Sequence, residues 1–324
     1  MRTNSGLRSS AKSIATVVAA TLVLALSACS STTTNYPQTA HFLQSKFSAK
    51  GVEGFSAGVI DYGFTLEALT QLLASGAELN SQVKQAATNL WAQSAQPTSG
   101  YLLDTETRSV KPGLAGKALV FGKVYAKQGD ATFFAIKSEL ESEVSANGEL
   151  DGSNGNAFDY GWAILGLTAA GSSKASILAT KLSSLIREDG GFGSDLSAST
   201  TSSSADATGI ALMAFAATKG KGDATQETTK DAAAARALAW LSKNALKANH
   251  FEAWGDVDVN GTEYAAMGLE AQSKNISAYR AWLSDRIAND GGLITPWSGK
   301  AGDTFATIQG LLVLDGRSYT DLVK

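Results

Sequence analysis

A helix-opening phrase recurs six times in this chain of 324 residues, roughly every fifty residues. Most copies begin with a charged residue, continue through small residues that include glycine, and end in an apolar run. A period of this length indicates one supersecondary unit repeated in tandem, because a single unit is too small to bury its own apolar face. The copies begin at Asp61, Lys111, Asp159, Asp206, Gly261 and Asp303.

A second helical pattern lies between the copies. Apolar residues fall three and four positions apart in it, and Lys, Arg, Glu, Gln and Ser occupy the other side, as in a surface helix. We therefore expect outer helices at 39–46, 81–92, 131–144, 174–186, 232–244 and 276–288.

The recurring phrases themselves predict an inner layer. The runs 162–169 and 210–217 are apolar nearly all round, which is typical of buried helices, and their glycines and alanines allow close packing. The order is outer then inner, six times, so the pattern predicts twelve helices in six hairpins and no β-strand runs.

The loop within five of the six hairpins carries a glycine beside an aromatic or aliphatic residue. Glycine supplies the positive φ of a tight helix exit, and we expect the neighbouring large side chain to pack under the next hairpin. The pairs are Gly54-Phe55, Gly100-Tyr101, Gly191-Phe192, Trp254-Gly255 and Gly292-Leu293.

These residues carry a resemblance. The Asp-Gly-Gly-Phe-Gly loop at 189–193, followed by Asp-Ala-Thr-Gly at 206–209, resembles the repeats of the terpenoid cyclase and protein prenyltransferase superfamily. The resemblance covers Pro37 to about Leu314. It implies an all-α fold, an α6/α6 toroid whose last hairpin packs against the first around a central cavity. The cobalamin carriers share this toroid, so the resemblance implies fold and leaves activity open.

The first residues predict export. Arg2, Arg8 and Lys12 precede an uncharged apolar run that closes on Leu-Ser-Ala-Cys at 26–29, which resembles a bacterial lipobox. We therefore predict a lipoprotein signal peptide at 1–28, a lipidated Cys29 with a polar tether at 29–36, and the toroid domain at 37–324. The predicted location is the outer face of a cell membrane, with the membrane as a partner through the Cys29 acyl chains.

Composition excludes several classes of function. Loss of the three basic residues of the signal takes the net charge from −3 to −6, which argues against binding to nucleic acid. Cys29 is the only cysteine, and His41 and His250 are the only histidines, so the zinc site of the prenyltransferases is excluded. The Asp-x-Asp-Asp phrase of the protonating cyclases and the Asp-Asp-x-x-Asp phrase of the ionising ones are also missing. We predict no metal and no cofactor, and we favour a protein that is not an enzyme.

The recurring acids give the candidate site. All inner helices of a toroid point the same way, so acids near their starts should ring one mouth of the cavity. Two interpretations remain open, helix N-capping alone or capping combined with a polar rim that also contacts a ligand. Lys111 breaks the acidic pattern once, and it would either pair with a neighbouring acid or mark the side where an anionic group of a ligand enters. The rim residues would be Asp61, Tyr62, Asp159, Tyr160, Trp162, Asp206, Glu263 and Asp303.

The function expected from these features is a lipoprotein that binds a small molecule or an envelope protein at the acidic mouth without catalysis. The alternative is an enzyme that uses the same cavity on a glycan or a terpenoid-like substrate. A glycan hydrolase would need two carboxylates across a cleft, such as Asp206 with Asp258 or Asp303. Its aromatic subsites would be Tyr101, Trp254 and Trp297. The Ser- and Thr-rich stretch 194–204 is either a solvated loop or a lid.

Overall fold

The computed structural model describes residues 34–97, 100–106, 108–153, 155–196 and 202–324, all within a single unit. The predicted signal peptide, Cys29 and the first part of the tether lie outside the described residues, as do residues 197–201 of the predicted lid. No helix in the described ranges is both long enough and apolar enough to cross a bilayer.

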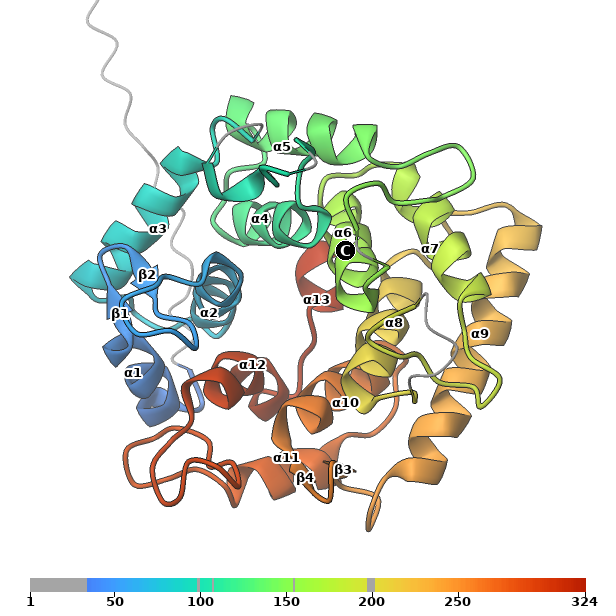
Figure 1. Ribbon diagram of the computed structural model, residues 1–324. Coiled ribbons are helices and arrows are strands. Elements are labelled where there is room, and N and C mark those ends of the chain that lie inside the picture. The colour runs from blue at the N-terminus through green and yellow to red at the C-terminus, as the bar shows by residue number, and fades with distance from the viewer. Residues whose placement is uncertain (1–33, 98–99, 107, 154, 197–201) are drawn as a thin grey trace, which may run out of the picture. The chain divides into compact units, whose positions relative to one another are not determined.

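The described residues form the two expected layers (Figure 1). The inner layer is buried nearly all round, and Ile210, Leu212 and Met213 of its fourth helix are all inaccessible to solvent. The inner helices are α2 (Tyr62–Ala74), α4 (Pro112–Val124), α6 (Ala157–Ala169), α8 (Ala205–Ala217), α10 (Val259–Ala271) and α12 (Thr304–Leu314). The outer helices are α1 (Pro37–Ser45), α3 (Ser81–Gln93), α5 (Ala131–Ser142), α7 (Lys174–Ser184), α9 (Ala224–Asn244) and α11 (Ser277–Ser284).

The ring closes, as the resemblance predicted. Helix α12 packs against α2, and α1 packs against α12, so the last hairpin contacts the first (Figure 1). Gln71 of α2 joins the two ends. Its Nε2 donates to the Gln309 carbonyl at 3.1 Å, and its Oε1 accepts from the Leu312 N–H at 2.7 Å. The fold class is therefore an all-α toroid of six hairpins.

Glycines set the spacing of two pairs of inner helices. A Cβ atom added to Gly116 of α4 would lie 2.1 Å from the carbonyl oxygen of Trp162 in α6, and Gly166 faces Gly116 across the same interface. Gly209 of α8 is equally close to α10, since its Cβ would lie 2.2 Å from the Tyr264 carbonyl oxygen. No other residue fits where two backbones approach so closely.

In three repeats, hydrogen bonds of a threonine side chain link the start of the inner helix to the loop that precedes it. The N-caps Asp61, Asp258 and Asp303 are each followed four residues later by a threonine. The threonine hydroxyl donates to the backbone carbonyl of the capping aspartate, at 2.6 Å for Thr65 and Thr262 and at 2.5 Å for Thr307. The same hydroxyl accepts a hydrogen bond from a backbone N–H of the preceding loop. The loop N–H groups belong to Val52, Phe251 and Leu293, which are buried. The loops are thereby held close to the helix starts.

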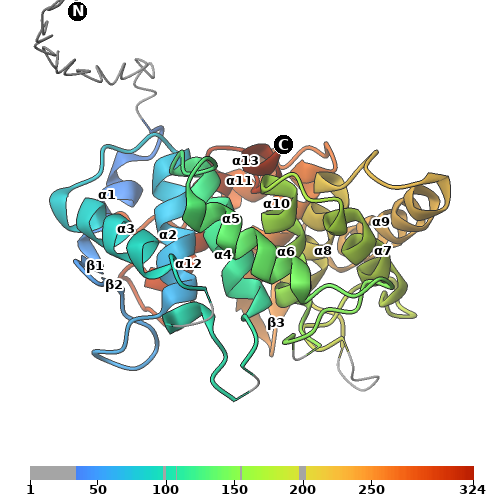
Figure 2. The ribbon, with the colours of Figure 1, turned by 90° about the horizontal axis from the view of Figure 1, so that it is seen from above.

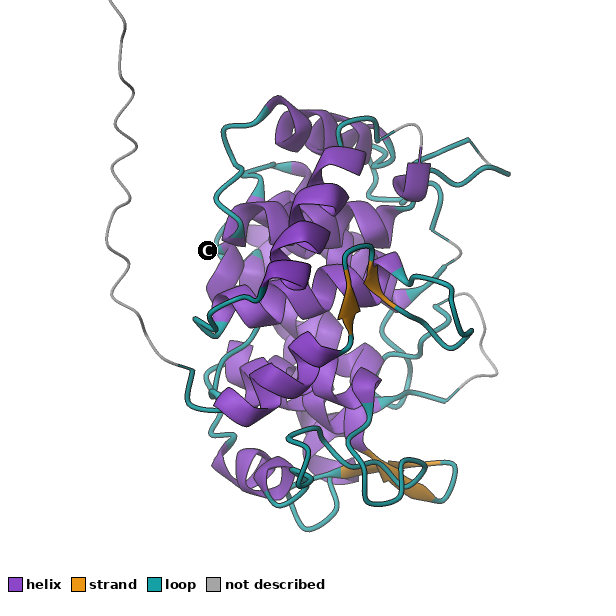
Figure 3. Cartoon of the chain, turned by 90° about the vertical axis from the view of Figure 1, so that its left-hand side faces the viewer, coloured by secondary structure: helices purple, strands orange, loops and turns teal. Residues whose placement is uncertain are grey.

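Two expectations need correction. Short strands do occur, as the antiparallel pairs β1 (Phe47–Ser48) with β2 (Gly51–Val52) and β3 (Phe251–Ala253) with β4 (Asp256–Asp258) (Figure 3). They are two or three residues long, too short to give an alternating pattern. The fifth outer helix begins eight residues earlier than predicted, at Ala224, because Asp223 and Gln226 form a capping box.

The chain ends inside the ring. After α12 it turns back into α13 (Thr320–Val323), which packs against α4, α6 and α8 (Figure 1). The Nζ of Lys123 in α4 holds this segment by donating to the carbonyl of Val323 at 2.8 Å. Tyr319, just before α13, is completely buried. One end of the ring is therefore closed by the C-terminal segment.

Candidate ligand-binding mouth

The two ends of the ring differ. The inner helices all begin at one end, which we call the mouth, and α13 closes the other end (Figure 2). The strands and long loops lie at the mouth (Figure 3). The first described residues lie at the closed end, because Asn35 Nδ2 donates to Oδ1 of Asp315, the C-cap of α12, at 3.1 Å. Residues 34–36 therefore lie at the end of the ring opposite the mouth.

A pocket of about 290 Å³ opens at the mouth. It is assembled from the starts of five inner helices, α2, α6, α8, α10 and α12, and from the loops before α2 and α12. Six of its lining residues are aromatic and five are polar. They are Phe55, Phe64, Phe158, Tyr264, Trp297 and Phe305, with Asp206, Asn260, Thr295, Asp303 and Gln309.

Aromatic rings form the walls of the pocket. The ring of Phe305 lies 4.1 Å from that of Phe55 and 4.5 Å from that of Phe64, and Phe158 meets Tyr264 edge to face at 5.3 Å. At the lip, the side chain of Phe55 is 83% exposed. The glycine cue predicted that such a residue packs under the next hairpin, which is right for the buried Phe192 and wrong for Phe55 and the fully exposed Trp254. The loop before α2 carries Phe55 away from the hairpin and over the pocket instead.

The four predicted aspartates lie at the helix starts around the mouth, and two of them, Asp206 and Asp303, line the pocket. Asp303 caps α12 by accepting from the Ala306 N–H at 3.0 Å. Asp206 lies in the first turn of α8, where Oδ1 accepts from the N–H of Ala207 at 2.7 Å. Asp61 caps α2 through the N–H of Phe64 at 2.8 Å, but it does not line the pocket.

Three of the predicted acids do not occupy an N-cap position. The N-cap residues of the third, fourth and fifth inner helices are Asn156, Ser204 and Asp258, whereas the capping interpretation placed Asp159 and Asp206 at the third and fourth helix starts and Glu263 near the fifth. Asp159 and Asp206 lie inside the first turn, where they can complement the helix dipole. The misreading arose because an acid in the first turn resembles a capping acid in the sequence.

Glu263 lies below the rim. It is completely buried, and neither of its carboxylate oxygens has a hydrogen-bond partner. It packs against α12, where a Cβ on Gly310 would lie 2.6 Å from Glu263 Oε1. Burial raises the pKa of this carboxyl well above its usual value, and the charges of Asp258, Asp303 and Glu67 raise it further. A neutral carboxyl costs less free energy to bury than a carboxylate. The completely buried Glu263 therefore belongs to the core and not to the rim.

The three predicted rim aromatics also face elsewhere. Tyr62 stacks on Tyr101 at 4.6 Å, beside the pocket. The hydroxyl of the buried Tyr160 accepts from the N–H of Leu150 at 3.3 Å, so it points into a loop. Trp162 is buried in the ring. The aromatic residues that do line the pocket include Phe64 and Phe305, whose place in the first turn of an inner helix was a visible signal that sequence reasoning missed.

A polar network forms the floor below the pocket. The Nζ of Lys117 pairs with Glu67, and the hydroxyl of Tyr264 donates to Glu67 Oε2 at 3.0 Å. The same Nζ lies 5.2 Å from the centre of the Trp162 ring. Burial raises the pKa of Tyr264 well above its usual value, and the charge of Glu67 raises it further. Tyr264 therefore remains a neutral donor that separates the pocket from the ion pair.

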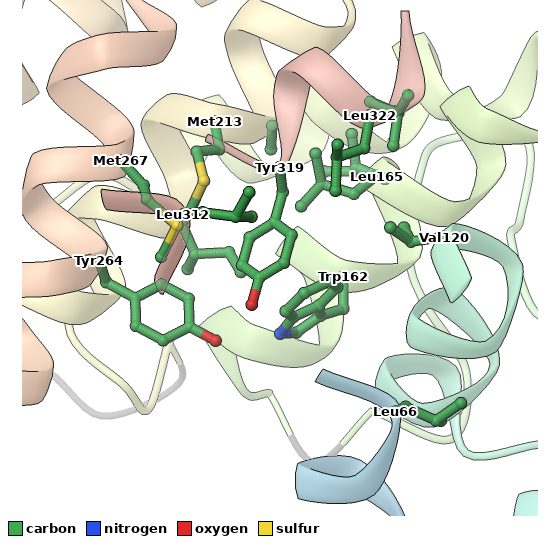
Figure 4. Close-up of a cluster of buried hydrophobic side chains, with 14 of the residues drawn as sticks. Leu66, Val120, Trp162, Leu165, Met213, Tyr264, Met267, Leu312, Tyr319 and Leu322 are labelled. Atoms are coloured by element: carbon green, nitrogen blue, oxygen red, sulfur yellow. The ribbon is translucent and has the colours of Figure 1, made fainter. Parts of the chain in front are cut away.

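The interior behind this floor is filled (Figure 4). Tyr319 meets Trp162 edge to face at 4.6 Å, and its hydroxyl accepts from Gln71 Nε2 at 2.8 Å. Met213, Met267 and other apolar side chains surround it (Figure 4). Within the ring, the space left for a ligand is therefore at the mouth.

Of the other residues proposed for a glycan hydrolase, only Trp297 lines the pocket. Asp258 caps α10 through the N–H of Gly261 at 2.8 Å, and its pKa is raised by burial and then by Asp206. Trp297 lines the pocket and is 79% exposed, whereas Tyr101 and Trp254 lie outside it. No group of three or more His, Cys, Asp or Glu side chains in the described part of the chain is arranged to hold a metal ion.

Neither a family model nor a curated protein matches the sequence. The fold is similar to that of several solved structures. Type II terpene cyclase MstE from Scytonema, in complex with geranylgeranyl dihydroxybenzoate, has a TM-score of 0.60 at 14% identity over 88% of this chain and 96% of the cyclase. Haptocorrin in complex with Cbi has a TM-score of 0.58 at 11% identity over 88% of this chain and 67% of haptocorrin.

An unsaturated glucuronyl hydrolase from Streptococcus agalactiae has a TM-score of 0.54 at 10% identity, over 86% of this chain and 87% of the hydrolase. All three have an α/α-toroid fold. At these identities the likeness shows the fold alone, and it confirms the predicted toroid.

Proposed function

We propose that this protein is a membrane-anchored lipoprotein that binds a small molecule at the mouth of its toroid without catalysis. The observation that carries the proposal is the contrast between the mouth and the interior. An open pocket walled by aromatic side chains lies at the mouth, and the interior behind it is filled by Tyr319, its neighbours and α13. Concave sites with apolar walls and a few convergent polar groups are the usual form of a small-molecule site.

The filled interior argues against a reaction inside the cavity. A substrate enclosed by the ring would have to displace Tyr319 and Trp162, which are buried against each other. Burying a ligand there would therefore cost the packing of the domain itself. A ligand at the mouth needs no such rearrangement.

The place of the tether supports the same reading. If Cys29 is lipidated, residues 30–36 connect the acyl chains to the end of the ring opposite the mouth. Seven residues span at most roughly 25 Å when fully extended. The anchor would then keep the closed end near the bilayer and present the mouth to the surroundings, which suits a receptor for a soluble ligand.

A glycan hydrolase is the second candidate. The observation that favours it is the presence of Asp206, Asp303 and the exposed Trp297 in one pocket. Glycoside hydrolysis requires a pair of carboxylates that flank the scissile bond, and an exposed indole offers a surface on which a sugar ring can stack. Against it, Asp303 already serves as a helix cap, and hydrogen bonding to the backbone occupies one of its oxygens.

Native mass spectrometry tests the proposal. Full-length protein extracted from its own membrane in mild detergent should carry a small molecule. The Trp297→Ala variant should lose most of it, since Trp297 lines the pocket, and the matched variant Trp254→Ala should retain it, since the fully exposed Trp254 does not. Equal retention by both variants, or no bound molecule in any preparation, would contradict the proposal. Turnover of a glycan that is abolished by Asp206→Asn would establish the second candidate instead.

A further inference from the structure

The lining of the mouth pocket has one sign of charge. Among the described residues that line it, two carry carboxylates, Asp206 and Asp303, and none is Lys, Arg or His. Asn260 Nδ2 donates to Gln309 Oε1 at 2.7 Å, so these two amides partly satisfy each other. The hydroxyl of Thr295 donates to Asp303 Oδ2 at 3.5 Å, and the charged groups left to meet a ligand are the two carboxylates, beside the aromatic rings.

Negative charge also accumulates around the pocket. The charge of Asp206 raises the pKa of Asp258, and the charges of Asp258 and Asp303 raise that of Glu263, in each case after the larger effect of burial. The amino group of Lys117 belongs to the floor of the pocket, where it pairs with Glu67. Its charge is thus directed at Glu67, and the carboxylates of the pocket are available to a cation from outside.

The aromatic walls of the pocket also attract positive charge. The face of an aromatic ring attracts a cation through its quadrupole, most strongly when the cation is partly desolvated. Phe55, Phe64 and Phe305 form a contiguous group on one side of the pocket, and Trp297 contributes a largely exposed indole at the lip. Rings and carboxylates therefore favour the same kind of ligand.

We infer that the mouth pocket binds an organic ammonium ion with apolar substituents, an inference that rests on the proposed binding function. The carboxylates of Asp206 and Asp303 pair with the positive charge, and the rings of Phe55, Phe305 and Trp297 cover the alkyl groups. A compact metal ion is disfavoured, because rings cannot replace its water shell. A neutral sugar can stack on the rings, but it gains no ion pairing from the two carboxylates.

Calorimetric titration of the full-length protein in detergent tests the class of ligand. The probes are choline and its neutral isostere 3,3-dimethylbutan-1-ol, which has the same shape and no charge. We expect choline to bind at least tenfold more tightly than the alcohol at low ionic strength, and the difference to shrink as salt is added. Cellobiose serves as the neutral sugar probe.

Two sets of variants locate the binding. Asp206→Asn and Asp303→Asn should each weaken choline binding severalfold and leave the weak binding of the alcohol unchanged. Asparagine caps a helix as well as aspartate does, so Asp303→Asn should keep α12 intact. Trp297→Ala should weaken choline binding, and the control Trp254→Ala should leave it as it is.

The outcomes separate the inference from the function on which it rests. Equal affinity for choline and the alcohol, or no binding of choline, would overturn the ammonium assignment. If cellobiose or a co-purified neutral molecule then binds and is lost in Trp297→Ala, the binding function stands and the ligand class is wrong. If no probe binds and no molecule co-purifies, both the ligand class and the proposed function fall.

Discussion

Replacement of Tyr319 by alanine tests whether the interior of the ring is a packed core. Tyr319 is completely buried, meets Trp162 edge to face at 4.6 Å and accepts a hydrogen bond from Gln71. Truncation of a buried aromatic side chain to alanine costs about 3–5 kcal/mol in the free energy of unfolding, because apolar burial is lost and a cavity remains. We expect a loss in this range for Tyr319→Ala.

The conservative variant Tyr319→Phe provides the matched control. It removes only the hydroxyl, and Gln71 Nε2 keeps its second partner, the carbonyl of Gln309 at 3.1 Å. The cost should therefore be about 1 kcal/mol, close to that of a single hydrogen bond. The difference between the two variants isolates the contribution of the ring packing.

Urea denaturation followed by circular dichroism measures both variants. A second readout is thermal stabilisation by benzene, because an apolar cavity of sufficient size binds small apolar molecules. Benzene should stabilise Tyr319→Ala more than the wild-type protein or Tyr319→Phe. A cost below about 1 kcal/mol for Tyr319→Ala would refute the reasoning. The interior would then be loosely packed, and a ligand could reach deeper than the mouth.

Three further predictions address packing, charge and anchoring. Gly116→Ala should destabilise the protein by about 1–3 kcal/mol or more in urea denaturation, because its Cβ would lie 2.1 Å from a backbone oxygen. Gly129→Ala, with nothing within 4 Å, should change stability by less than about 0.5 kcal/mol, and equal effects would contradict the close approach of α4 and α6. Glu263 has a raised pKa in the folded state, so the folded protein holds its proton after the unfolded chain has released it. The free energy of unfolding should consequently fall as pH rises above 4.5, and Glu263→Gln should flatten this slope relative to wild type; parallel curves would count against it. Cys29→Ser should either release the protein from the detergent phase of a phase-partitioning assay or leave an uncleaved precursor, and a cleaved form that still partitions into detergent would disprove the lipid anchor.

The helices were predictable because their signals are local. Apolar residues three and four apart, glycines at the exits and the recurrence of the phrase depend only on neighbours along the chain. Helix boundaries were less certain. The start of α9 depends on the capping box of Asp223 with Gln226, and the third and fourth inner helices begin before the acids that resembled their caps.

The pocket was only partly predictable, for a geometric reason. Asp206 and Asp303 could be named in advance, because all inner helices run in the same direction and their first turns must share one end. The contribution of Phe55 depends on the path of a loop, and that of Tyr264 depends on which face of α10 points inward. Neither contribution can be read from the order of residues, because each depends on how the helices are rotated and placed in the closed ring.

The sequence by itself determined the number of hairpins, their two layers and the end at which the acids gather, because each of these follows from periodicity along the chain. Only the tertiary structure decided that the interior is closed. The segment 315–323 is too short to carry a periodic pattern, and its burial arises from contacts with helices that lie about 100 to 200 residues away in the chain. The same long-range packing seals one end of the ring and leaves the mouth as the place for a ligand.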